Sequence, residues 1–196
     1  MFNLSKLIPA TFSPTITDMI RMDHNHVLLA FHQYRAQARP RVKQALTETI
    51  CTALDIHATL EEEIFYPVMR QLDGADPVTQ KSKPEHDDMR ALMARLGSGH
   101  GSQDERDRLL MELMQTVIHH VADEETVLLP RAERMLGKER LRALGAQMTQ
   151  RRLQLAGPKM GKIVANSAVG FSGSTGMVLL AVAATFLAGR YLTVKG

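Results

Sequence analysis

The sequence of 196 residues has no tryptophan, one cysteine and few aromatic residues, which make up only 5% of the chain. A single cysteine excludes an intramolecular disulfide framework and any metal site built from several thiolates. The scarcity of aromatic residues argues against a surface on which nucleic-acid bases stack, so we expect no nucleic-acid partner. The first 19 residues contain two prolines and no long apolar run, which is unlike a signal peptide.

The remaining composition is that of a globular protein, with 44% hydrophobic and 23% charged residues. Eight histidines and twelve methionines stand out, and the charges are unevenly distributed. Residues 1–130 carry 19 acidic and 13 basic residues, whereas residues 131–196 carry 11 basic and two acidic residues. The chain therefore divides into an acidic, histidine-rich body and a basic C-terminal part.

Apolar residues recur at steps of three and four along the body, which is the period of an amphipathic α-helix. Turn signals rich in proline, glycine and aspartate separate four such segments, and the second signal extends from Leu72 to Pro84. The expected helices cover residues 17–36, 42–70, 84–96 and 103–134. Their short connections predict an all-α fold, an up-down-up-down four-helix bundle over residues 16–136. A fifth, basic helix is expected over residues 138–155, within a helix-and-linker region of residues 137–162.

The body also repeats itself. Residues 57–67, HATLEEEIFYP, align with residues 120–130, HVADEETVLLP, at an offset of 63 residues. The acidic-His pair at residues 23–24 aligns with the one at residues 85–86 at an offset of 62 residues. The sequence therefore predicts two helical hairpins, each with one acidic-His helix and one His-x-x-x-Glu helix. The proline that closes each longer block is expected to bend or end its helix.

Each His-x-x-x-Glu pair places an imidazole and a carboxylate on the same face of a helix, because residues four apart project side by side. Both pairs lie on the apolar stripe that should face the core, where an unpaired carboxylate is costly and a bound cation removes that cost. The other two helices each add one inward histidine. Imidazole and carboxylate ligands suit iron, manganese or zinc. The candidate ligands are His24, His57, Glu61, His86, His120 and Glu124.

These residues in a four-helix layout resemble the hemerythrin (HHE cation-binding) family over about residues 16–150. The resemblance implies a non-haem di-iron site in which the six candidate ligands hold two iron ions joined by an oxo or hydroxo bridge. It also implies a small ligand such as O₂, NO or peroxide. Oxygen carriers of the family use a fifth histidine one turn from the third-helix histidine, and here Ser82 and Arg90 stand one turn either side of His86. We therefore expect a non-enzymatic role in sensing, storage or local delivery rather than bulk oxygen transport.

Two other functions stay open. One is an iron-dependent protein that reacts with NO or peroxide or repairs iron centres, as some members of that family do. The other is a metal-free structural bundle, in which the His–Glu pairs are surface ion pairs or the histidines are satisfied within the core. The sequence contains no Glu-x-x-His and no His-Glu-x-x-His motif, which argues against a ferritin-like bundle and a zinc protease. The acidic neighbours of the candidate ligands, expected on the polar exterior, are Glu62, Glu63, Asp123 and Glu125. The alternative that one of them orients an imidazole N–H of a ligand stays open. The histidines expected outside the metal site are His26, His32, His100 and His119.

The C-terminal part contains a long uncharged stretch. No charged residue occurs from residue 163 to residue 189, a length sufficient for a helix to cross a bilayer. We expect a transmembrane anchor over residues 163–192, and the excess of basic residues before it places the bundle in the cytoplasm. The alternative is a soluble cytoplasmic protein whose apolar tail docks on a partner or is buried in an oligomer. The oligomeric state is left open.

Overall fold

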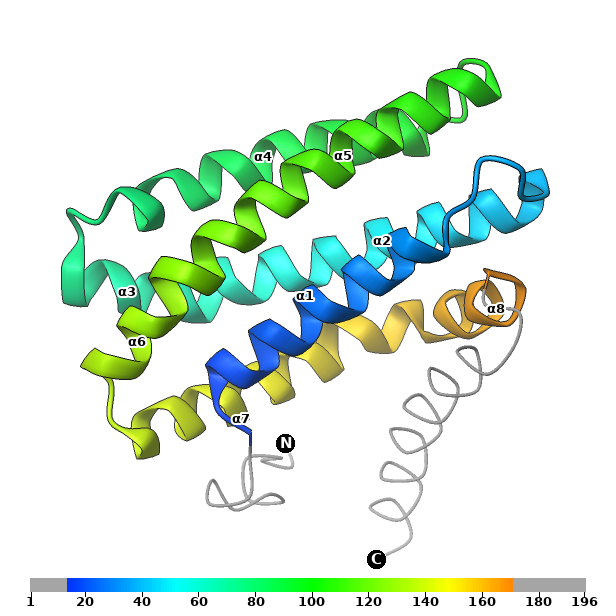
Figure 1. The fold of residues 1–196 in the computed structure, drawn as a ribbon. Coiled ribbons are helices and arrows are strands. Elements are labelled where there is room, and N and C mark those ends of the chain that lie inside the picture. The colour runs from blue at the N-terminus through cyan, green and yellow to red at the C-terminus, as the bar shows by residue number, and fades with distance from the viewer. Residues whose placement is uncertain (1–13, 171–196) are drawn as a thin grey trace, which may run out of the picture.

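The computed structural model describes residues 14–170, and every regular element in this range is helical (Figure 1). The predicted all-α fold is confirmed. The α-helices are α1 (Ile16–Gln33), α2 (Pro40–Leu60), α3 (Tyr66–Asp73), α4 (Pro77–Gly97), α5 (Gln103–Asp123), α6 (Leu129–Met135), α7 (Lys138–Ala156) and α8 (Met160–Gly170). Three short elements join some of them, the π-helical turns η3 (Glu61–Phe65) and η4 (Glu124–Leu128) and the 3-10 turn η5 (Gly157–Lys159).

Four long helical rods form the bundle, and each corresponds to one of the predicted segments, although the first ends at Gln33 and not at the predicted residue 36. The rods are α1, α2–η3–α3, α4 and α5–η4–α6. The first rod packs against the second, the third packs against the fourth, and α2 packs against α4 (Figure 1). Short loops at residues 34–39 and 98–102 join the rods within each pair. The bundle therefore consists of two helical hairpins, as the internal repeat predicts.

Helix α4 begins earlier than the sequence predicts. It starts at Pro77 because Asp76 accepts a hydrogen bond from the backbone N–H of Thr79 at 2.9 Å. Proline is well tolerated at the first helical position, because a backbone N–H there would have no hydrogen-bond partner within the helix. Pro84 then lies inside the helix, where it removes one backbone hydrogen bond without ending it. The predicted turn from Leu72 to Pro84 is therefore wrong in its second half, since the cap outweighs a single interior proline.

Both His-x-x-x-Glu rods contain one π-helical turn, and the two turns are 63 residues apart, like the repeat itself. In the first turn the backbone N–H of Tyr66 bonds to the carbonyl of Glu61, five residues back, and the second turn is built in the same way. The proline that follows each turn, Pro67 or Pro130, has no N–H to donate. Both rods nevertheless continue, into α3 and α6, so neither proline ends its helix.

Two apolar clusters fill the bundle and lie on either side of a polar layer. The first cluster, at the end where α3, α6 and α7 lie, includes Ile16, Ile20, Leu60, Phe65, Tyr66, Met69, Leu128, Leu129, Leu144 and Met148. The second, toward the loops within the hairpins, includes Val27, Phe31, Leu46, Ile50, Leu54, Met89, Leu92, Leu110, Leu113 and Val117. Polar groups in the layer between them have little access to water, so they must bind one another or a cation.

The fifth predicted helix is present as α7 and lies along α1 and α2 (Figure 1). Its buried face consists of Leu141, Leu144, Gly145 and Met148. Glycine is required in this face because a Cβ atom at Gly145 would lie 2.1 Å from the carbonyl oxygen of Pro14. Helix α7 is thus packed tightly into the first cluster, at the point where α1 begins.

The predicted transmembrane helix is not found in the described part of the chain, because no helix between residues 14 and 170 is both long and apolar enough to span a bilayer. The first eight residues of the predicted anchor, 163–170, belong to α8, which packs against α2. At this contact a Cβ atom on Gly170 would lie 3.1 Å from the side chain of Leu46. The rest of the predicted anchor, residues 171–192, lies outside the described residues.

Candidate metal centre

All six predicted ligands meet in the polar layer between the two apolar clusters. None of them is more than 5% exposed, and the two glutamates are completely buried. The rods contribute them in turn, His24 from α1, His57 and Glu61 from α2–η3, His86 from α4, and His120 and Glu124 from α5–η4. The structure therefore brings together residues that lie up to 100 positions apart in the sequence.

The six side chains form two groups that share a carboxylate. One group is His24, His57, Glu61 and Glu124, and the other is Glu61, His86 and His120; within each, the candidate ligand atoms lie within 4.8 Å of one another. The Oε2 atom of Glu61 lies 3.1 Å from Nε2 of His57 and 3.4 Å from Nε2 of His86. The Oε2 atom of Glu124 lies 3.2 Å from Nε2 of His24 and 3.5 Å from Nε2 of His120. Each carboxylate thus reaches one histidine of the first hairpin and one histidine of the second hairpin, as a ligand shared by two metal ions would have to.

Four buried atoms of this layer have no hydrogen-bond partner within residues 14–170. They are Nε2 of His24, Nε2 of His57, Oε1 of Glu61 and Oε2 of Glu124. An unsatisfied buried polar atom costs about 1–3 kcal/mol, and buried polar atoms in native cores are nearly always paired. Imidazole nitrogens and carboxylate oxygens form the donor set of iron, manganese and zinc. The residues present therefore fit a pair of such metal ions.

Burial and mutual repulsion control the charge on the two glutamates. Burial raises the pKa of Glu61 well above its ordinary value, and the nearby carboxylate of Glu124 raises it further. Burial acts in the same direction on Glu124, but the charge of His120 and the close contact with the His24 imidazole outweigh it and lower the pKa of Glu124. Two facing carboxylates cannot both ionise without positive charge between them. A bound metal ion would supply that charge.

The two histidines of the first group differ in charge. Burial acts to lower the pKa of His24, but its 3.2 Å contact with Glu124 and the charge of that carboxylate outweigh burial and raise the pKa to about 9. Burial lowers the pKa of His57 to about 4, even though Asp23 opposes this shift. At neutral pH, His57 already offers a free nitrogen lone pair, whereas His24 must lose a proton before it can bind a metal.

The residue that follows each of the two glutamates holds a histidine on another rod. Glu62 contacts Nδ1 of His86 at 3.0 Å, and Glu125 contacts Nδ1 of His24 at 2.9 Å. These contacts fix the orientation of each ring, so that Nε2 faces the layer. Glu62 and Glu125 therefore do more than form the polar exterior: both reach across a helix–helix contact and orient an imidazole, a role that the sequence leaves open for one such residue.

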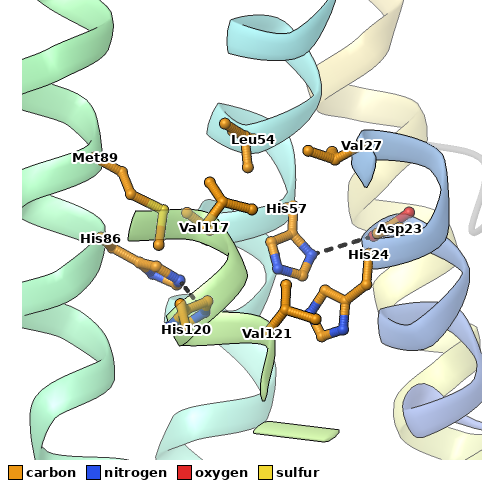
Figure 2. Close-up of a pocket in the computed structure, with 11 residues that line it drawn as sticks. Asp23, His24, Val27, Leu54, His57, His86, Met89, Val117, His120 and Val121 are labelled. Carbon is orange, nitrogen blue, oxygen red and sulfur yellow. Dashed lines mark hydrogen bonds and ion pairs between the residues drawn. The ribbon is translucent and has the colours of Figure 1, made fainter. Parts of the chain in front are cut away.

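The acidic residues that directly precede His24 and His86 orient the two remaining imidazole rings, those of His57 and His120. Glu85 contacts Nδ1 of His120 at 2.8 Å, and Asp23 lies 3.5 Å from Nδ1 of His57 (Figure 2). With Glu62 and Glu125, these residues form a ring of four carboxylates outside the four histidines. We call it the carboxylate ring. Its members occupy matching positions in the two halves of the repeat.

A cation pairs with each member of the carboxylate ring. The pairs are Arg21 with Glu125, Arg90 with Glu62, Lys81 with Glu85, and Arg152 with Asp23. Burial acts to raise the pKa of Asp23, but its bonds to His57 and Arg152 outweigh burial and lower the pKa to about 2. Asp23 is therefore held in its charged form, which is the form that accepts a hydrogen bond from the His57 imidazole.

The hydroxyl of Tyr66 is a further member of the polar layer. It lies 2.8 Å from Oε1 of Glu124, 3.1 Å from Oε2 of Glu61 and 3.3 Å from Nε2 of His86. Tyr66 is completely buried, and burial together with the charge of Glu124 raises its pKa well above the ordinary value. The equivalent position in the second half of the repeat is Leu129, so this hydroxyl makes the two halves different.

The two positions considered for a fifth histidine have other roles. Arg90 is bonded to Glu62 at 2.7 Å and belongs to the outer cations. The hydroxyl of Ser82 donates a hydrogen bond to the backbone carbonyl of Val78 at 2.7 Å. Tyr66 is the additional polar side chain that reaches the layer near His86. The site thus has no fifth histidine one turn from His86, and the hydroxyl of Tyr66 reaches the layer there.

A small cavity lies against the histidines on the side of the second apolar cluster, away from Tyr66. Its apolar lining is Val27, Leu54, Ala58, Met89, Val117 and Val121, and Figure 2 shows the four imidazoles beside it. Its volume is about 10 Å³, which leaves room for roughly one water-sized molecule. The site is therefore shaped for a very small ligand.

The remaining candidate residues lie outside the layer. Glu63 pairs with Arg151 at the surface, and Asp123 pairs with Lys81. His26, His32, His100 and His119 belong to neither of the two candidate metal-binding groups found among residues 14–170.

The sequence alone predicts neither the full carboxylate ring nor Tyr66 as part of the site. The repeat does carry a signal for the carboxylate ring, since an acidic residue precedes both His24 and His86 and another follows both Glu61 and Glu124. It carries no such signal for Tyr66, because the second half lacks an equivalent tyrosine.

The fold and the layer define a four-helix-bundle protein with a paired His/carboxylate site for metal cations. Residues 15–132 match the model of the family described as "Hemerythrin HHE cation binding domain". The chain belongs to this family, which confirms the resemblance seen in the sequence. It is also similar to a protein named "DNA nickase" from Nostoc sp. (strain PCC 7120 / SAG 25.82 / UTEX 2576), with 32% identity over 124 residues. The match covers 63% of this chain and 35% of that protein, so this chain spans about a third of its relative's length. No solved structure matches the chain.

Proposed function

We propose that this chain is a non-haem di-iron protein that binds O₂, NO or a similar small ligand such as peroxide. Its role is sensing, storage or local delivery, without catalytic turnover. The observation that carries the proposal is the pair of buried ligand groups that share Glu61. Membership of a cation-binding family supports a bound metal, and iron suits a donor set of imidazoles and carboxylates.

The residues divide the two metal positions between the hairpins. His24 and His57 would hold one ion and His86 and His120 the other, with Glu61 and Glu124 between them. A bound iron pair supplies exchangeable coordination positions and electrons to a small molecule. Four nitrogens and two carboxylates do not fill the coordination of two such ions, so the protein leaves positions open.

The surrounding side chains determine what can reach those positions. Val27, Leu54 and Val117 close the cavity with apolar surface and leave space only for a very small ligand. The carboxylate ring fixes the histidine rings, so little reorientation is needed when a ligand binds. On the opposite side, the neutral Tyr66 hydroxyl can donate a hydrogen bond to the carboxylate of Glu61 or Glu124, the two residues that would lie between the ions.

The name of the Nostoc relative concerns DNA, and the burial of this site argues against such a substrate here. All six candidate ligands are at most 5% exposed. A phosphodiester of duplex DNA could reach them only if the bundle opened. We therefore propose no nucleic-acid partner, and a nicking assay on supercoiled plasmid with iron-loaded protein is the corresponding control.

Iron stoichiometry and spectroscopy test the proposal. The full chain is loaded with Fe(II) without oxygen, and its iron content and visible spectrum are measured before and after addition of O₂ or NO. We expect two iron ions per chain and a spectral change that saturates at stoichiometric ligand. Continued consumption of NO or peroxide would instead establish reactive chemistry, and a folded protein without iron would establish a structural bundle. His120→Ala should lose metal, and the adjacent His119→Ala is the matched control.

A further inference from the structure

One member of the carboxylate ring is held from outside the family domain. Arg21, Arg90 and Lys81 all lie within residues 15–132, but the cation paired with Asp23 is Arg152 in α7. Its guanidinium binds Asp23 at two points, with distances of 2.5 Å from Nη1 to Oδ1 and 2.6 Å from Nη2 to Oδ2. This bidentate geometry fixes the carboxylate in both position and orientation.

The contact continues from Asp23 to one metal position only. Oδ2 of Asp23 faces Nδ1 of His57 (Figure 2), and His57 belongs to the group with His24, Glu61 and Glu124. Asp23 and Arg152 are only 14% and 20% exposed, so water cannot readily replace the guanidinium. Without Arg152, the carboxylate would lose the two hydrogen-bond donors that hold it and would turn away. His57 would then lose the acceptor that orients its ring.

We propose that Arg152 is a positioning residue for the metal position formed by His24 and His57. Helix α7 thereby makes that position depend on a segment beyond the family domain. The position formed by His86 and His120 does not share this dependence, because Arg90 and Lys81, both in α4, hold its carboxylates. This inference rests on the proposed binding of two metal ions.

The neighbouring Arg151 provides a matched control. It is also in α7 and also forms a bidentate pair, with Glu63 at 2.6 and 2.9 Å, but Glu63 contacts none of the four histidines. Loss of Arg151 removes a similar ion pair between α7 and the bundle without touching the carboxylate ring. Arg152→Gln and Arg151→Gln in the full chain therefore separate positioning from general packing of α7.

The first measurement is metal content. Wild type, both variants and Arg152→Lys are loaded with Fe(II) or, as a spectroscopic probe, Co(II), and freed of loosely bound metal. We expect two ions per chain in wild type and Arg151→Gln, about one in Arg152→Gln, and partial recovery in Arg152→Lys. Thermal unfolding and circular dichroism of the metal-free proteins establish that each variant is folded.

The second measurement needs no metal. Nitrogen NMR of the metal-free protein reports which ring nitrogen of His57 carries the proton, and a His57→Gln variant assigns the signal. We expect Arg152→Gln to change the His57 signal and Arg151→Gln to leave it unchanged. Two tightly bound ions in Arg152→Gln, or an unchanged His57 signal, would overturn the inference and leave the proposed function intact. A folded wild type without metal would overturn both.

Discussion

The hydroxyl of Tyr66 lies 2.8 Å from Oε1 of Glu124, and it reaches the layer from a position where the other half of the repeat has leucine. It places a neutral hydrogen-bond donor beside two facing carboxylates. The site is thus asymmetric although the repeat that builds it is nearly symmetric.

Replacing Tyr66 by Phe should destabilise the metal-free protein. The ring keeps its packing in the first cluster, but the buried carboxylates lose a donor, which costs about 1–3 kcal/mol of the free energy of unfolding. Urea denaturation measures this loss. Tyr34→Phe is the matched control, because the Tyr34 hydroxyl contacts Asp107 at 2.7 Å in a half-exposed setting and its loss should cost less. Equal losses in the two variants would contradict the expectation.

Replacing Glu61 by Ala should remove most of the bound metal. Glu61 belongs to both ligand groups, so its loss weakens both positions rather than one. Elemental analysis of protein loaded with Fe(II) gives the number of ions per chain. Glu63→Ala changes the same helical turn but only breaks the surface pair with Arg151, and it should retain two ions. Two ions in Glu61→Ala would show that Glu61 is not a shared ligand.

Filling the cavity should slow ligand binding without loss of metal. Val117→Ile adds one methylene group to a side chain that lines a space of about 10 Å³. We expect binding of azide or NO, followed by stopped-flow absorbance, to slow at least several-fold while the iron content is unchanged. Val68→Ile is the control, because Val68 packs against the first cluster, away from the cavity. Unchanged binding in Val117→Ile would mean that ligands enter by another route.

The single cysteine should react slowly with thiol reagents. Burial, together with the charges of Glu48 and Asp55, raises the pKa of Cys51 from 9.0 to about 12. Because the thiolate is the reactive form, its population near pH 8 falls by about 1000-fold. The rate of alkylation by iodoacetamide, followed by mass spectrometry, should keep rising about tenfold per pH unit between pH 8 and pH 10. In the urea-unfolded chain it should level off near pH 9, and a similar plateau in the folded protein would refute the raised pKa.

The sequence was sufficient to predict the four rods and the six side chains that meet between them. Helical periodicity located the rods, and the repeat showed that one histidine on each rod faces the same interior. The start of α4 was harder to predict, because Asp76 and Pro77 signal a helix start while Pro84 signals an end. Local signals of similar strength conflict there, and only the structure shows that the cap prevails.

The outer contacts could not be predicted from single helices. Glu62 lies about 100° from Glu61 around a helix axis and was expected to face water. Whether it does depends on the neighbouring rod, and here His86 and Arg90 lie within its reach. Tyr66 would lie about 140° from Glu61 in a regular α-helix, outside the layer. The π-helical turn between them rotates Tyr66 so that its hydroxyl reaches the polar layer, and no feature of the sequence predicts that turn.

The π-helical turns also determine where the chain can change in length. Each turn accommodates one residue more than an ordinary α-helix needs over the same distance. A chain lacking Glu63 would place Tyr66 four residues after Glu61, where a regular helix still directs both toward the layer. A one-residue deletion elsewhere in a rod would instead rotate everything beyond it by about 100° and withdraw its ligands. Within the rods, homologous chains of different length should therefore differ at Glu61–Phe65 and Glu124–Leu128.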